Sequence, residues 1–357
     1  MNKNTKKLQE QGVSLWLDNI TRKILNDGTL KKYITELSVT GLTSNPTIFD
    51  NAIANSNDYD KAISLSERGL TNEDLFFNLA IEDIQRAADL FRPVFDKTNG
   101  VDGFVSIEVS PLLAYDAEST VNAARVIFKK VNRPNAFIKI PGTPEGLPAI
   151  EQAIAEGIPI NVTLLFSANQ YKAAANAYLN GIEKRISQGL NPDVRSVASV
   201  FVSRWDKAVS GKVSVGLANK LALAVSQKTY EAYAQFLSSG RVQKLMNLGV
   251  SPQRLLWAST GAKDPAVSDV IYVTNLVTPF TVNTIPENTL LAFADHGDVN
   301  EPLSLACTLT NSLLEQFKKE GVDIDALAEQ LQKEGAASFI DSWNHLINSI
   351  DQKRKSI

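Results

Sequence analysis

Eight short apolar runs, alternating with polar or Gly/Pro turns and helical patterns, constrain the fold of this chain more than any other feature. The runs are "LWLDNI" (15–20), "SVTGLTSNP" (38–46), "GFVSIEVSP" (103–111), "AFIKIPGT" (136–143), "IPINVTLLF" (158–166), "VASVFVS" (197–203), "RLLWAST" (254–260) and "LVTPFTVNTI" (276–285). Near-continuous apolar strands that alternate with helices are typical of a parallel sheet covered on both faces. Eight such units over roughly 300 residues favour a closed (β/α)8 barrel over an open sheet.

The stretches between the runs show helical periodicity. Within 73–91, apolar side chains such as Phe76 and Ala80 recur every three or four residues and so share one helix face. The same pattern recurs at 121–131, 169–186 and 219–237. Ser119 and Ser167 stand where two of these patterns begin, and we expect each to cap its helix. No Gly-x-Gly-x-x-Gly follows any run, which argues against a dinucleotide-binding sheet.

The chain after about residue 300 consists of helical patterns without further strand runs. We therefore expect an α/β protein with one domain over 1–357, a single (β/α)8 TIM barrel whose residues 300–357 form an appended helical extension. These C-terminal helices could cover the barrel or form a subunit contact, so a homo-oligomer stays possible.

Composition excludes several classes of function. The net charge of −3 argues against a nucleic-acid or anionic-membrane surface. Cys307 is the single cysteine, and His296 and His345 are the only histidines, which leaves too few ligands for a structural zinc site. The first twelve residues lack the apolar core of a signal peptide, so we expect a cytoplasmic protein. Lysine and carboxylate side chains remain as the candidates for chemistry.

Polar residues interrupt the apolar runs near their carboxyl ends, where a (β/α)8 barrel carries its active site. They are Asp18, Asn45, Glu108, Lys139, Asn161, Thr163, Ser199, Arg204, Ser259 and Lys263. Several have an ordinary structural explanation: Asn45 suits a turn, Asp18 could cap a helix, and Glu108 could form a buried ion pair with Lys139. A core built for stability alone would place Val, Ile and Leu at these positions. Their accumulation around one lysine therefore indicates a site.

Lys139 lies in "NAFIKIPGT", a segment so apolar that it predicts a buried strand. Burial of an isolated ammonium group is costly. A buried amine that is neutral, however, is a nucleophile for carbonyl compounds. The position of Lys139 therefore favours Schiff-base chemistry.

Several of these segments resemble, in order, the signature segments of transaldolases. They are "LWLDNITR", "GLTSNPTIFDNAI", "VSIEVSP", "FIKIPGTPEGLPAI", "GIPINVTLLFS" and "ASVFVSRWD", and the likeness spans about residues 12–300. It is strongest to the longer bacterial subgroup, which carries extra C-terminal helices. The resemblance implies transfer of a dihydroxyacetone unit from sedoheptulose 7-phosphate to glyceraldehyde 3-phosphate, giving erythrose 4-phosphate and fructose 6-phosphate. It places the reaction in the non-oxidative pentose phosphate pathway and implies no metal or organic cofactor.

The resemblance also assigns catalytic roles, position by position. Lys139 matches the lysine that forms a Schiff base with the donor ketone. Asp18 matches the carboxylate that handles the C4 hydroxyl proton during cleavage. Glu108 and Thr163 match the pair that positions a water for proton transfer.

Other matched positions bind the substrate. Asn45, Asn161 and Ser199 correspond to residues that contact the sugar, and Arg204 corresponds to a phosphate ligand. At the second phosphate ligand the sequence departs from the shorter transaldolases, which carry an arginine two residues after the serine matched by Ser259. Gly261 stands there instead, and the nearest cation is Lys263, an arrangement often seen in the longer subgroup.

Three alternatives remain open at the level of sequence. An aldolase of the same superfamily would release the three-carbon unit, although such enzymes are shorter and lack the extension. A non-catalytic sugar-phosphate-binding barrel would keep the cavity without turnover. Fusion to a phosphoglucose isomerase domain is not expected, because residues up to 357 leave no room for one.

Overall fold

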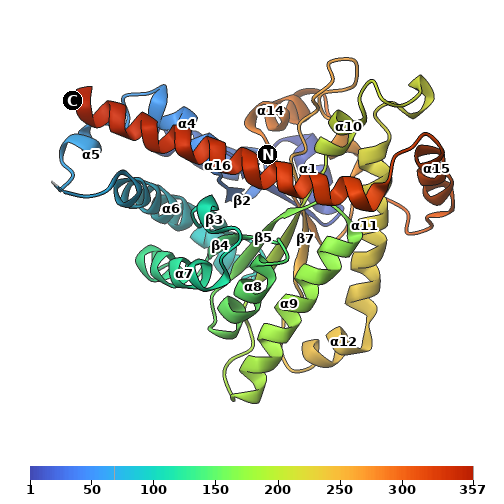
Figure 1. Cartoon of the computed structure of the whole chain (residues 1–357), viewed down its shortest axis with the longest axis horizontal. Helices are drawn as coiled ribbons and strands as arrows, with labels where there is room; N and C mark the ends of the chain where they lie inside the picture. The colour runs from blue at the N-terminus through green and yellow to red at the C-terminus, as the bar shows by residue number, and fades with distance from the viewer. Residues whose placement is uncertain (68, 357) are drawn as a thin grey trace.

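The computed structural model describes residues 1–67 and 69–356 and contains a closed barrel of eight parallel strands in chain order (Figure 1). The strands are β1 (Val13–Asp18), β2 (Val39–Thr43), β3 (Val105–Glu108), β4 (Ala136–Pro141), β5 (Ile160–Leu165), β6 (Ser196–Phe201), β7 (Arg254–Ala258) and β8 (Thr281–Ile285). Each falls on or beside one of the eight predicted runs, so the (β/α)8 prediction is confirmed. No described helix combines the length and apolar composition needed to span a membrane.

Helices connect and surround the strands (Figure 1). The longer ones are α1 (Lys3–Glu10), α3 (Thr29–Glu36), α4 (Pro46–Ala54), α6 (Asn72–Lys97), α7 (Ala117–Val131), α8 (Gly146–Ala155), α9 (Ala168–Ser187), α11 (Leu221–Ser238), α14 (Glu287–His296), α15 (Thr308–Lys319) and α16 (Ile324–Ser356). The shorter ones are α2 (Arg22–Asn26), α5 (Asp60–Ser64), α10 (Arg204–Val209), α12 (Gly240–Met246), α13 (Ile271–Asn275), η1 (Pro111–Leu113) and η2 (Val215–Leu217).

Of the two predicted helix caps, Ser167 and Ser119, the first is confirmed and the second is wrong. Ser167 caps α9, and its partner Gln170 completes a capping box, as predicted. The prediction for Ser119 is wrong, because Asp116 caps α7 and accepts a hydrogen bond from the Ser119 backbone N–H. An aspartate three residues earlier supplies the same acceptor and moves the helix start upstream.

Only the second half of the last apolar run, 276–285, forms a strand. Strand β8 begins at Thr281, and residues 276–280 form a loop that leads into it. Within this loop Phe280 has a positive φ of 63°, which departs from the extended backbone of a regular strand. Leu164 shows the same departure at the register shift in β5. The apolar character of the loop therefore reflects packing rather than pairing.

The barrel interior is filled in layers, because side chains two positions apart on a strand share a face. Asp18 and Lys139 lie toward the carboxyl ends of β1 and β4, and Trp16 and Phe137 lie one layer below them. The Trp16 and Phe137 rings stack with centroids 6.2 Å apart. Gly41 stands opposite Trp16 in the register, where a Cβ atom would come within 2.5 Å of the indole. This aromatic layer closes the barrel beneath the polar residues.

The C-terminal helix α16 crosses the carboxyl ends of the strands and appears as the long red helix in Figure 1. Gln332 on α16 donates hydrogen bonds to the carbonyl oxygens of Gly142 (3.0 Å) and Leu164 (2.8 Å). Gly142 directly follows β4, and Leu164 is the last residue but one of β5. Near its other end, Lys353 forms an ion pair with Asp60 at 2.6 Å. The extension therefore forms a roof over the mouth of the barrel.

Candidate active site

A cavity of about 500 Å³ opens at the carboxyl ends of the strands, beneath α16. It is lined by Asp18, Thr43, Asn45, Thr47, Ile48, Asn51, Lys139, Ser199, Phe201, Arg204, Ala258, Ser259, Lys263, Thr284, Pro286 and Phe339. Seven of the ten predicted site residues are in this lining. Glu108, Asn161 and Thr163 are buried beside it on the neighbouring strands.

Lys139 is the buried cation of this cavity, with a side-chain exposure of 6%. Its Nζ donates a hydrogen bond to the Ser44 carbonyl oxygen at 3.2 Å and lies 3.6 Å from Oε2 of Glu108. The Phe339 ring of α16 covers the amine, with its centroid 5.7 Å from Nζ. The amine therefore has one backbone acceptor, one carboxylate at slightly more than hydrogen-bond distance, and an aromatic cover.

Glu108 is buried, and its carboxylate lacks hydrogen-bond partners in the described part of the chain. Neither carboxylate oxygen has a hydrogen-bond partner among the described residues, and the same is true of Oγ1 of Thr163. Burial raises the pKa of Glu108 to about 7, although the charge of Lys139 opposes the shift. A small cavity of about 10 Å³ adjoins Glu108 and is closed by Asn45 and Trp343, which is about the space of one water molecule.

Replacement of Glu108 by glutamine should remove a pH-dependent loss of stability. Because the native pKa lies above the unfolded value of 4.5, the native state binds this proton more tightly, and the free energy of unfolding falls as pH rises from about 4.5 to 7. Glu108→Gln mimics the protonated form at every pH. Chemical denaturation should show similar stabilities at pH 5 and an advantage for Glu108→Gln on the order of 2–3 kcal/mol at pH 8.5. Glu118→Gln, at an exposed glutamate of α7, is the control, and a pH-independent difference for Glu108→Gln would contradict the assignment.

Asp18 ends β1 and faces the same cavity. Its Oδ1 accepts a hydrogen bond from the Thr43 hydroxyl at 2.8 Å, and Thr43 is in turn 2.6 Å from the Thr284 hydroxyl. Burial raises the pKa of Asp18, against the opposing charges of Lys139 and Lys263. The alternative explanation that Asp18 caps the following helix is wrong, because Thr21 is the N-cap of α2. Asp18 is thus a carboxylate held in the cavity wall.

A chain of hydrogen bonds fixes the amide of Asn161. Ser199 donates to its Oδ1 at 2.7 Å, and its Nδ2 donates to Oγ of Ser106 at 3.1 Å. Ser44 donates to the Ser106 carbonyl oxygen at 2.8 Å. Since Asn161 pairs with Lys139 in the register of β4 and β5, this chain of bonds holds the strands around the lysine.

Asn45 combines a structural position with a place in the cavity lining. It caps α4, where its Oδ1 accepts a hydrogen bond from the Ile48 backbone N–H at 3.1 Å. The structure thus replaces the turn suggested by the sequence with a helix N-cap, and the residue also faces the cavity.

Two further cations, Arg204 at the start of α10 and Lys263 in the loop after β7, line the cavity. Arg204 is half-buried there, and burial lowers its pKa although Glu334 of α16 opposes the shift. Partial desolvation and the neighbouring charges of Arg204 and Lys207 lower the pKa of Lys263. The Ser259 hydroxyl lies 2.9 Å from that of Ser203, and Ser259 has a positive φ of 56°. Cations this close together suit an anionic ligand.

Several cavity residues carry no signal that sequence patterns could reveal. Phe339 comes from the extension, where its apolar character is indistinguishable from ordinary helix packing. Thr43 and Thr284 stand in strands, where threonine is common. Phe201 looked like another core residue of β6. Among residues 1–67 and 69–356, no three His, Cys, Asp or Glu side chains gather as a metal site would require.

Comparison with known proteins gives a consistent result over nearly the whole chain. The family model described as transaldolase/fructose-6-phosphate aldolase matches residues 15–350. A transaldolase of Thermobifida fusca is 44% identical over 356 residues, covering 97% of this chain and 97% of the relative. A transaldolase of Saccharopolyspora erythraea is 42% identical over 360 residues (99% and 98%), and transaldolase 2 of a Nostoc species is 41% identical over 368 residues (98% and 97%).

Proposed function

The chain belongs to the transaldolase and fructose-6-phosphate aldolase family, and on this basis we propose that it transfers a dihydroxyacetone unit between sugar phosphates through a Schiff base on Lys139. The donor is sedoheptulose 7-phosphate and the acceptor is glyceraldehyde 3-phosphate. The observation that carries this proposal is the buried amine of Lys139, which shares one cavity with Asp18 and a group of cations.

The first step is attack of Nζ of Lys139 on the C2 ketone of the donor, followed by loss of water to give an iminium ion. Proton transfers in this step need a relay, and Glu108 with Thr163 is well suited to hold a water for it. Support for that role comes from three buried oxygen atoms without partners, on Glu108 and Thr163, and from a space for about one water that adjoins Glu108 but is not lined by Thr163. A carboxylate whose pKa is about 7 can both give and take a proton near neutrality.

Cleavage of the C3–C4 bond follows, and the iminium ion accepts the electron pair as an enamine. Asp18 takes the proton of the C4 hydroxyl. The fragment that begins at C4 then leaves as an aldehyde. The enamine then attacks the carbonyl carbon of the acceptor, and the steps run in reverse to release the new ketose. No metal is needed, because the protonated imine is itself the electron sink.

The remaining cavity residues hold the substrate. Arg204, Lys263 and Ser259, which line the same cavity as Lys139, bind the phosphate. Ser199, Asn45 and Asn161 contact the hydroxyls of the bound unit. The roof formed by α16, with Phe339 above the amine, restricts water around the enamine and so favours transfer over release.

A kinetic comparison of transfer with release tests the proposed activity. Fructose 6-phosphate and erythrose 4-phosphate should give glyceraldehyde 3-phosphate at a steady rate in a coupled assay. Fructose 6-phosphate alone should give free dihydroxyacetone only at the background of the assay. Equal rates in the two assays would identify a fructose 6-phosphate aldolase instead, and no product in either would identify a barrel that only binds sugar phosphates.

A further inference from the structure

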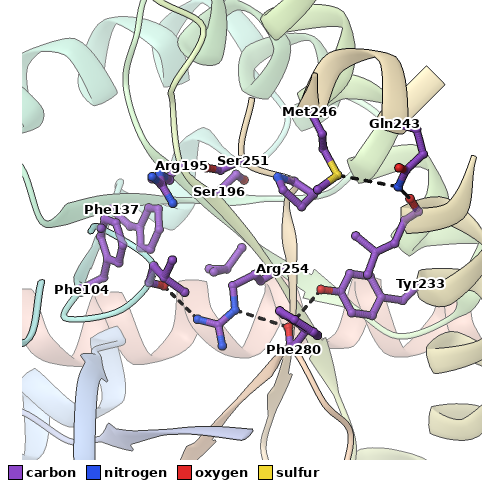
Figure 2. Close-up of a pocket in the computed structure, with 15 residues that line it drawn as sticks. Phe104, Phe137, Arg195, Ser196, Tyr233, Gln243, Met246, Ser251, Arg254 and Phe280 are labelled. Carbon is purple, nitrogen blue, oxygen red and sulfur yellow. Dashed lines mark hydrogen bonds between the residues drawn. The ribbon is translucent and has the colours of Figure 1, made fainter. Parts of the chain in front are cut away.

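A second cavity, of about 360 Å³, lies at the opposite end of the barrel from the candidate active site (Figure 2). Its walls are the amino-terminal ends of β4, β6 and β7, the loops that lead into β3 and β8, and the helices α11 and α12. The aromatic layer of the barrel separates it from Lys139. Nothing in the proposed reaction uses this space.

The interior of this cavity is apolar and well formed. The Phe104 and Phe137 rings stack with centroids 4.1 Å apart and an interplanar angle of 21°, and both side chains are buried. Met246 of α12 forms part of the facing wall (Figure 2). Concave, mostly apolar sites of about 300–1,000 Å³ with few polar groups are typical of small-molecule binding sites.

The charged side chains in its walls are two arginines. Arg195 is neutralised by Asp193, with Nε 2.8 Å from Oδ1. Arg254 instead donates to the carbonyl oxygens of Val101 (3.0 Å), Thr281 (2.9 Å) and Phe280 (3.4 Å) and to the Ser14 hydroxyl (2.7 Å), which leaves one N–H of Nη1 for a ligand. Among residues 1–67 and 69–356 it has no carboxylate within 4.0 Å. These hydrogen bonds therefore fix the orientation of the guanidinium group without neutralising its charge.

The rim of the cavity carries an aromatic residue in an unfavourable conformation. Phe280 has a φ of 63°, and its side chain is 72% exposed. Its backbone is fixed by a hydrogen bond from its own N–H to the Gly12 carbonyl oxygen and by another from the Tyr233 hydroxyl to its carbonyl oxygen. Strained backbone conformations cluster at ligand-binding and active sites.

We propose that this cavity binds an amphipathic carboxylate, a small molecule with an apolar body and one anionic head. The body packs against Phe104, Phe137 and Met246, with the Phe280 ring at the entrance. The carboxylate lies at the Arg254 guanidinium, whose fixed orientation suits a charge-assisted contact. This inference is independent of the proposed catalytic activity.

Calorimetric titration of the full chain with decanoate, below its micelle concentration at pH 8, tests the proposal. We expect one molecule to bind per chain, and 1-decanol to bind at least about tenfold more weakly because it lacks the charge. Met246→Trp, which enlarges a partly exposed side chain of the cavity wall, should weaken decanoate binding at least about tenfold. Leu248→Trp makes the same change at an exposed position two residues on, outside the cavity wall, and should bind as the parent does.

The outcomes separate the parts of the proposal. Absence of decanoate binding, or unchanged binding by Met246→Trp, would overturn the site itself. Equal affinities for decanoate and 1-decanol would overturn the assignment of Arg254 as the anion partner. Because this last comparison uses the unmodified protein, it does not depend on whether an Arg254 variant folds.

Discussion

Replacement of Lys139 by methionine is expected to abolish sugar-phosphate turnover, with a loss of about 10⁴-fold or more. Methionine keeps the length and apolar character of the side chain but has no amine, so neither the iminium ion nor the enamine can form. The aromatic layer and the roof of α16 should be unaffected, because the change stays within the volume of the native side chain. A melting curve should therefore show a folded protein.

Borohydride trapping identifies the nucleophile directly. With fructose 6-phosphate, the parent protein should acquire a stable adduct on the peptide that contains Lys139, and Lys139→Met should acquire none. Lys212→Met, at an exposed lysine in a turn, is the matched control and should be trapped at the parent rate. An adduct that persists in Lys139→Met, for example on the other cavity lysine, Lys263, would contradict the assignment.

The barrel could be predicted because its strands are buried on both faces and so read as unbroken apolar runs. The same rule failed for residues 276–280, where apolar side chains pack in the loop that leads into β8. Apart from the last run, the predicted runs begin within two residues of their strands and continue one to three residues past the strand ends.

The candidate site could be predicted only in part, for a physical reason. Residues on strands converge at one mouth by the geometry of the barrel, which is how Asp18 and Lys139 were selected. The position of α16 depends on tertiary contacts such as those of Gln332, and no local pattern encodes them. Phe339 was therefore missed, although its ring is the aromatic cover of the Lys139 amine. The roles of the individual residues remain predictions.

Replacement of Asp18 by asparagine is expected to slow turnover by about 10²- to 10⁴-fold, at the cleavage step rather than at imine formation. Asparagine can still accept the hydrogen bond from Thr43, so the local geometry should persist. It cannot take the proton of the C4 hydroxyl, so the donor should remain bound to Lys139 as an uncleaved imine. The carbon count of the trapped adduct reports this difference.

With fructose 6-phosphate and borohydride, the parent protein cleaves the donor and should yield a three-carbon adduct, whereas Asp18→Asn should yield the phosphorylated six-carbon adduct. Asp58→Asn, at an exposed aspartate beside α5, should behave as the parent does. A three-carbon adduct formed by Asp18→Asn at the parent rate would assign the proton transfer to another group. Loss of all trapping would mean that Asp18 acts before cleavage. Because each intermediate has its own mass, one experiment distinguishes a residue that acts on the C3–C4 bond from one that only shapes the cavity.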